Sequence, residues 1–299
     1  MKRYQLIFLF LFLFQAARAQ YPSVYSQYLF NGLAINPAYA GSRESLAMTV
    51  LHRSQWQGFE GAPKTNTLAV HSPLKNEKVA LGVLLYNDRY GITEQSGALL
   101  SYAYRIPVWN GKLSMGLQGG FMSRKYDWNS IHTIQQNDQT FSGRAKYTQP
   151  SAGTGLYYFS SKLFAGFSIP ELMTFHGING DKNALRYKTY LLTAGYIFDF
   201  GHAWKLKPSF LLKCARGSSL QADLNSFLYF REKIGFGISY RTSDALVFLL
   251  SIQASRQLSM GYSYDRTMSR LSSYNNGSHE IMISYDFKYT VKTKSPRSF

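Results

Sequence analysis

Histidine is the first side chain to examine for chemistry in this sequence, because it binds metals and transfers protons near neutral pH. No two histidines have the spacing that would place both on one helix face as metal ligands, and no HExxH motif occurs. Most of them lie in expected loops or at expected strand ends. The pattern therefore predicts neither a metal centre nor acid–base catalysis. The six are His52, His71, His132, His176, His202 and His279.

Other reactive side chains give no stronger signal. Asp181-Lys182-Asn183 follows Gly180, but the further acidic ligands that calcium requires are missing, so a turn is expected. Serine and histidine are both present, yet no spacing selects a hydrolase triad with an acidic partner. The single Cys214 cannot form an intramolecular disulfide, and it shares a strand face with Leu206, Pro208, Phe210 and Leu212, which predicts a lipid-facing position. We expect no enzymatic activity and no cofactor.

The elements that carry these residues are predicted to be strands, because hydrophobicity alternates with a period of two. In residues 190–200, Tyr190, Leu192 and Ala194 share one apolar face. The opposite faces are rich in glycine and small polar residues, as expected where a closed sheet curves around an interior. The clearest segments are 112–121, 162–169, 190–200, 233–241, 257–264 and 280–289.

The connections separate a membrane barrel from a soluble sandwich, which would show the same period. Long connections (Ser54 to Pro63, Lys125 to Gln149, Arg266 to Ser278) alternate with short ones (Leu74 to Asn76, Ser160-Ser161). Outer-membrane barrels have long loops outside the cell and tight turns in the periplasm. The sequence therefore predicts an all-β fold, a single antiparallel transmembrane β-barrel of about 14 strands with a short N-terminal pre-barrel segment.

The N-terminus predicts export. Lys2 and Arg3 precede an apolar run from Leu6 to Phe14, and Ala17-Arg18-Ala19 has the small-x-small pattern of a signal peptidase site. We divide the chain into a signal peptide (1–19), a pre-barrel segment (20–43), the outer-membrane barrel (44–289) and a basic tail (290–299). The expected location is the outer membrane.

The composition is basic and aromatic. The formal charge is +17, and removal of Lys2, Arg3 and Arg18 with the signal leaves 17 − 3 = +14, because residues 1–19 contain no acid. A basic exported protein should meet an anionic partner, either lipid phosphate at the barrel rims or a specific acidic protein. Because the chain is expected to be exported, no nucleic-acid partner is expected.

Several long motifs resemble the PorP/SprF family of the Bacteroidetes type IX secretion system. They are SQYLFNGLAINPAYAGS (26–42), HRSQWQGFEGAPKTNTLAVHSPL (52–74), VLLYNDRYGIT (83–93), LKPSFLLK (206–213), GISYRTSDAL (237–246), GYSYD (261–265) and SHEIMISYDF (278–287). The resemblance covers nearly the whole mature chain in order, whereas residues 125–146 show no family pattern. It implies a barrel that works with other secretion or gliding components and helps to export secreted cargo or hold it at the cell surface.

The motifs supply the candidate family-motif and partner-binding residues: Asn36, Pro37, Tyr39, Gly41, Arg53, Gln55, Trp56, Gly58, Phe59, Gly61, Pro63, Lys64, Asn87 and Asp88. Trp56 and Phe59 fit either an aromatic girdle at the outer interface or a rigid surface for cargo. The aromatic residues of 21–43 are too many for a solvated tail, so they should be buried in the barrel or against a partner at its periplasmic mouth.

Two functions remain open from the sequence. The first is a non-enzymatic export and anchoring barrel of type IX secretion, which the resemblance implies. The second is a passive pore or hydrophobic-solute transporter, which a barrel alone would equally permit.

Overall fold

A computed structural model describes residues 25–75, 77–128, 143–172, 188–215 and 218–287. Within these residues, three short 3-10 helices accompany the strands: η2 (Gly32–Ala34), η3 (Pro37–Tyr39) and η6 (Arg270–Tyr274). No helix in these residues is long and apolar enough to cross a membrane. The strands are β1 (Ala47–Ser54), β2 (Lys64–Pro73), β3 (Val79–Tyr90), β4 (Thr93–Val108), β5 (Gly111–Asp127), β6 (Arg144–Ser160), β7 (Leu163–Ile169), β8 (Thr189–Tyr196), β9 (Phe198–Phe200), β10 (Trp204–Ala215), β11 (Gln221–Phe230), β12 (Ile234–Arg241), β13 (Ala245–Gln253), β14 (Leu258–Thr267) and β15 (Ser278–Asp286).

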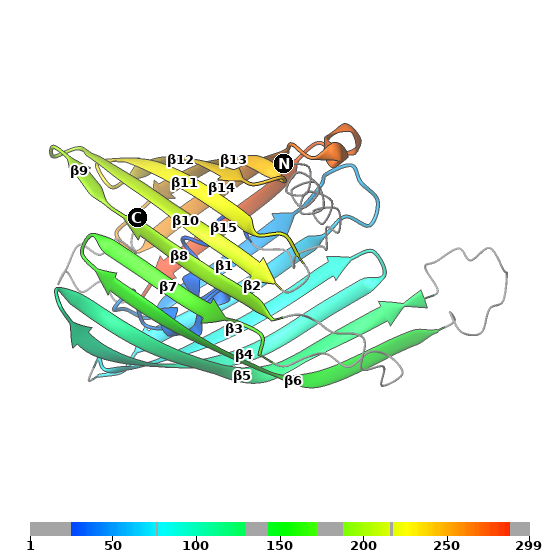
Figure 1. The fold of residues 1–299 in the computed structure, drawn as a ribbon, viewed down its shortest axis with the longest axis horizontal. Coiled ribbons are helices and arrows are strands. Elements are labelled where there is room, and N and C mark those ends of the chain that lie inside the picture. Colours follow the sequence, from blue (N-terminus) through cyan, green and yellow to red (C-terminus); the bar gives the residue numbers. More distant parts are fainter. Residues whose placement is uncertain (1–24, 76, 129–142, 173–187, 216–217, 288–299) are drawn as a thin grey trace, which may run out of the picture.

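The strands form one closed antiparallel sheet (Figure 1). Each strand pairs with its neighbours in sequence, and β1 pairs with β15 over the whole length of β1, which closes the ring. The short β9 follows β8 after Ile197, and both pair with β10, so they make one traverse of the wall. Counted in this way, the 15 strands make 15 − 1 = 14 traverses. The predicted 14-stranded barrel is confirmed.

The alternation of faces follows the sequence. Leu192 is 43% exposed on the outer surface, whereas its neighbours Leu191 and Thr193 are buried toward the interior. Cys214 is exposed on the outer face of β10, as its apolar neighbours predict. The outer surface is therefore the apolar one, which is the arrangement of a barrel in a bilayer.

The long β1–β2 and β14–β15 connections lie at one end of the barrel, at the right in Figure 1, together with the short β3–β4 and β12–β13 turns, whereas the described connections at the other end are all short. Two strands are longer than predicted: β5 continues to Asp127 and β6 begins at Arg144, so the connection expected at 125–149 is shorter. The apolar alternation ends before these strands do, but their backbone pairing continues to the strand ends because it does not depend on side-chain polarity. The connection between β3 and β4 is a two-residue turn, Gly91 and Ile92.

Several sequence-based predictions fall outside the described residues. These are the signal peptide, the basic tail, His132, His176 and the turn at Asp181-Lys182-Asn183. Of the other histidines, His52 hydrogen-bonds Asn66 and His279 hydrogen-bonds Tyr262, each within the wall. In the part of the chain that the structure describes, no three His, Cys, Asp or Glu residues form a metal-binding group.

The outward face of β8 gives a stability prediction. Leu192→Arg should destabilise the barrel by about 2 to 4 kcal/mol if the position is near the bilayer midplane, because it places a cation in hydrocarbon. Equilibrium unfolding in liposomes, followed by tryptophan fluorescence, measures the change. The control Ser161→Arg, in an exposed turn, should not alter the free energy of unfolding. An equal decrease in the free energy of unfolding in both variants would contradict the placement of Leu192 on the outer face.

The distribution of connections gives a topology prediction. In a Cys214→Ala background, Glu60→Cys in the β1–β2 connection should react with a membrane-impermeant maleimide on whole cells. Ser161→Cys in the β6–β7 turn should react only after the outer membrane is opened, because long loops face the exterior. Labelling of Ser161→Cys on intact cells, with Glu60→Cys protected, would invert the orientation.

Candidate functional site

The interior of the barrel is occupied by the chain's own N-terminal residues. We call residues 25–43 the plug; in Figure 1 they are the dark-blue segment inside the ring of strands. From Ser26 to Ser42 every residue except Ala34 is buried. The sequence left two locations open for the aromatic residues of 21–43, and the structure places Tyr25, Tyr28, Phe30 and Tyr39 in the barrel interior.

The segment Asn36 to Gly41 fixes the plug to the wall. Asn36 caps η3: its side chain accepts a hydrogen bond from the Ala38 N–H (2.9 Å) and donates one to the Leu156 carbonyl of β6 (2.9 Å). Pro37 follows at the first helical position, where a backbone N–H would have no partner within the helix, so its absence breaks no hydrogen bond. A Cβ atom on Gly116 of β5 would collide with the Pro37–Ala38 backbone. The wall therefore has a glycine where the plug backbone comes closest.

Gly41 ends this segment with a left-handed backbone conformation (φ +68°) that favours glycine. Its N–H donates to His71 Nδ1 (3.1 Å), and its carbonyl accepts from Arg105 (2.8 Å). Both partners are buried wall residues, on β2 and β4. Gly41 therefore connects the plug to two strands where the chain turns toward β1.

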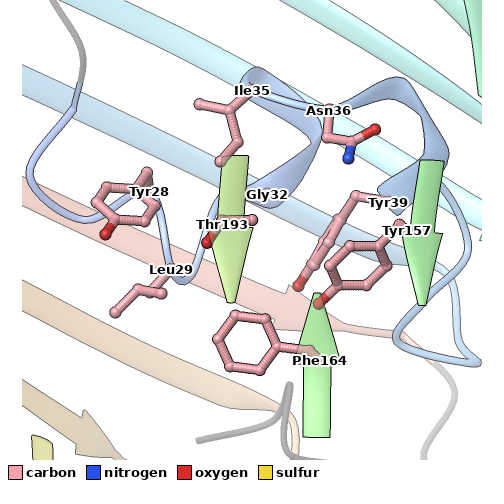
Figure 2. A pocket seen from close by; sticks show the side chains of 9 residues that line it. All are labelled: Tyr28, Leu29, Gly32, Ile35, Asn36, Tyr39, Tyr157, Phe164 and Thr193. Carbon is pink, nitrogen blue, oxygen red and sulfur yellow. The ribbon is translucent and has the colours of Figure 1, made fainter. Parts of the chain in front are cut away.

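Aromatic side chains pack the plug against the wall. Tyr39 contacts Tyr157 with ring centroids 5.4 Å apart, and Phe30 meets Phe227 edge-to-face at 5.4 Å. The Tyr28 hydroxyl accepts a hydrogen bond from Asn225 (2.5 Å). A small cavity of about 20 Å³ remains between plug and wall, room for about one water molecule. Figure 2 shows its lining: Tyr28, Leu29, Gly32, Ile35, Asn36, Tyr39, Tyr157, Phe164 and Thr193.

A buried charge cluster holds the start of the plug. The two carboxylate oxygens of Glu280 accept the backbone N–H groups of Ser26 (2.9 Å) and Gln27 (2.7 Å). The Ser26 hydroxyl donates to Asp265 (2.7 Å) and accepts from Arg53 (2.8 Å). One serine of the plug therefore contacts charged residues from β1, β14 and β15.

The cluster is balanced by ion pairs among six strands, β1, β10, β11, β12, β14 and β15. Arg53 pairs with Asp265 (2.8 Å) and Glu280 (3.1 Å), and Arg241 pairs with Asp265 (3.3 Å) and Asp223 (3.3 Å). Lys213 completes it at 3.1 Å from Asp223. These six side chains are at most 4% exposed. Charges buried so deeply need partners for all their polar atoms, and the plug supplies some of them.

The β1–β2 connection forms an ordered rim at the long-loop end. Gln57 exchanges two backbone hydrogen bonds with the β14–β15 connection, to Gly277 and from Asn276 (both 2.8 Å). On its other side, the Gly61 carbonyl accepts from Gly91 N–H (2.8 Å). Phe59, at 48% exposure, is held outward by this framework. A large apolar side chain on a fixed backbone is suited to protein contact.

The candidate residues thus divide into two groups. Asn36, Pro37, Tyr39, Gly41 and Arg53 are buried, and their described contacts are with the barrel's own chain. Gln55, Trp56, Gly58, Phe59, Gly61, Pro63 and Lys64 lie at the rim, and Asn87 and Asp88 near the end of β3. A partner-binding role for any of them stays a prediction.

Sequence reasoning missed most of the charge cluster. Asp223, Arg241, Asp265 and Glu280 were not selected, although each lies at an inward position of an alternating strand. The available signal was a charged residue on the inward face of a strand whose outward face is apolar. It does not reveal the pairing, because the cluster brings together residues far apart in the sequence, from Ser26 to Glu280.

Solved structures support the fold. The toluene transporter TbuX from Ralstonia pickettii aligns with a TM-score of 0.51 at 9% identity, covering 87% of this chain and 94% of that one. The CymD monoaromatic hydrocarbon channel aligns with a TM-score of 0.50 at 12% identity, covering 87% and 93%. At such identities the likeness concerns the fold alone. Among curated proteins, none matches the chain.

Family comparison is more specific than these fold matches. Residues 17–285 match the family described as type IX secretion system membrane protein PorP/SprF. The match includes the plug, the rim and every strand of the wall except the last residue of β15. The chain belongs to the PorP/SprF family of type IX secretion system membrane proteins.

Proposed function

We propose that this protein is a plugged, non-enzymatic outer-membrane barrel that anchors or helps to export secreted proteins of the type IX system. The single observation that carries this proposal is the plug in the barrel interior. A protein that conducts solutes needs an open path, whereas an anchor needs a rigid wall and an accessible rim.

The plug is bound on several sides of the lumen. Asn31 donates to Thr67 of β2 (3.3 Å), Ser168 of β7 donates to the Ile35 carbonyl (2.6 Å), and Asn225 of β11 donates to Tyr28. Glu280 of β15 holds the first residues. A solute path through the interior would require many of these bonds to break together. This makes the plug a structural filler in our proposal.

The rim is the proposed contact surface for partners. Family membership implies contact with components of the secretion machinery. Trp56 and Phe59 lie on a connection that is hydrogen-bonded to both neighbouring connections, so little conformational entropy would be lost on binding. We propose that secreted cargo or a machinery component binds here, and that a role in gliding would act through the same surface.

The passive pore or hydrophobic-solute transporter remains the alternative. The plug argues against it, because the buried residues of 26–42 occupy the interior and are hydrogen-bonded to β2, β7, β11 and β15. The ion conductance of the protein in planar bilayers distinguishes a plugged anchoring barrel from a pore.

The full-length barrel should be nearly silent in planar bilayers. A variant lacking residues 25–40, with the preceding residues kept, should still insert, because all strand pairing lies between Ala47 and Asp286. It should conduct ions steadily, since the charged wall residues would line a hydrated lumen. Heat-modifiable mobility on gels verifies folding. A full-length protein that conducts as well as the deletion variant would overturn the proposal.

The rim gives a second test. Trp56→Ser combined with Phe59→Ser should reduce the amount of type IX components crosslinked to the protein in cells, measured by quantitative mass spectrometry. Trp109→Ser is the matched control, because Trp109 is 90% exposed in the β4–β5 turn at the opposite end. Unchanged crosslinking in the rim variant, or an equal loss in the control, would show that the rim is not the partner site.

A further inference from the structure

The outer surface of β2 to β6 carries a row of charged side chains at one register position. Lys64 lies opposite Arg89, Arg89 opposite Glu94, Glu94 opposite Lys125, and Lys125 opposite Lys146. The strand alternation directs all five to the outer surface, and the four cations are exposed. We call these four cations and Glu94 the cationic row. It lies at the long-loop end of the barrel.

The chemistry of the wall changes in layers toward this row. Two residues further into each strand, the outward side chains are amides and hydroxyls: Asn66, Asn87, Ser96, Ser123 and Thr148. Two residues further again they are apolar: Leu68, Leu85, Ala98, Phe121 and Pro150. This sequence of layers matches the passage from hydrocarbon through the interface to lipid headgroups.

In the part of the chain that the structure describes, Glu94 is the one carboxylate that forms an ion pair with a cation of the row. Glu94 lies 3.8 Å from Lys125 and also accepts a hydrogen bond from Asn87 (3.0 Å), so four cations share one acid. Two cross-strand pairs, Lys64 with Arg89 and Lys125 with Lys146, place like charges directly opposite each other, which destabilises a sheet. Two residues nearer the strand ends, Asp127 lies opposite Arg144. This pair is neutral, since the two side chains are 3.1 Å apart and oppositely charged. The excess positive charge is therefore localised.

We propose that the cationic row binds the phosphate groups of a bisphosphorylated glycolipid in the outer leaflet, whose acyl chains pack on the apolar layer below. The ligand must be amphiphilic, because the cations adjoin a lipid-facing apolar surface. The two cation pairs are separated by β4, so their nearest members, Arg89 on β3 and Lys125 on β5, lie two strand spacings of about 4.8 Å, or about 10 Å, apart. One headgroup with two phosphates can reach both pairs. Arginine and lysine are the side chains that bind phosphate in proteins.

This inference does not depend on the anchoring function, because it concerns the opposite surface of the wall from the plug. It depends on the long loops being outside the cell, which the cysteine labelling tests separately. A free phosphate ion would satisfy the cations but not the apolar layer, so lipid and ion give different results in a binding experiment.

Purified full-length protein in detergent is titrated with bisphosphorylated lipid A, and binding is measured by native mass spectrometry. Lys125→Gln with Lys146→Gln, and Lys64→Gln with Arg89→Gln, should each weaken binding about tenfold or more, since each removes two cations. Monophosphorylated lipid A should bind the wild type more weakly than the bisphosphorylated lipid does. Removal of one cation pair should reduce the affinity for the monophosphorylated lipid by a smaller factor than it reduces the affinity for the bisphosphorylated lipid. Heat-modifiable mobility verifies that each variant is folded.

Three controls define what would overturn the proposal. Lys75→Gln with Lys233→Gln removes two exposed cations from turns at the opposite end and should leave lipid A binding unchanged. Zwitterionic phosphatidylcholine should not compete, and inorganic pyrophosphate should compete only at far higher concentration. Equal affinity in the row variants and the wild type, equal loss in the control variant, or full competition by pyrophosphate would each contradict a glycolipid site.

Discussion

A closed ring of fourteen strands encloses more space than its own inward side chains can fill, and the rest of this structure follows from that constraint. Barrels of about 8 strands fill their interior with wall side chains, whereas those of about 16 leave an aqueous channel. Here the plug takes the remaining space. Many wall positions facing it are small: Gly82, Gly116, Gly155 and Gly261 each lie where a Cβ atom would press against plug residues. Wall and plug are therefore complementary in shape.

The same constraint explains the buried charges. An apolar interior would suffice to fill the lumen, but it would not fix the position of a short segment with little regular structure. Glu280 accepts two successive backbone N–H groups, which specifies the register of the plug to a single residue. Buried ion pairs contribute little net stability, because desolvation offsets their attraction, yet removing one partner is costly. We interpret the cluster as a device for position and specificity.

The inner and outer surfaces of the wall thus contact different surroundings. The inner surface binds the plug through glycine, aromatic and charged side chains. The outer surface meets the membrane through an apolar layer, and toward the long-loop end of β2 to β6 through amides, hydroxyls and then cations. A period of two lets one strand serve both surfaces, since successive side chains point to opposite sides. In our proposal, the rim connections are the surface that contacts other proteins.

The sequence by itself determined the strand number, the faces of β8 and β10 and the end at which long connections gather, because these follow from a local period of two and from loop length. Its motifs also selected Asn36, Gly41 and Arg53. It did not determine where the plug lies, since burial in the barrel and burial against a partner satisfy the same aromatic composition. Nor did it show that Arg53 meets Asp265 and Glu280, or that β5 and β6 extend beyond their apolar alternation. Those features depend on the closure of β1 against β15 and on backbone pairing between distant residues, and only the tertiary structure brings these groups together.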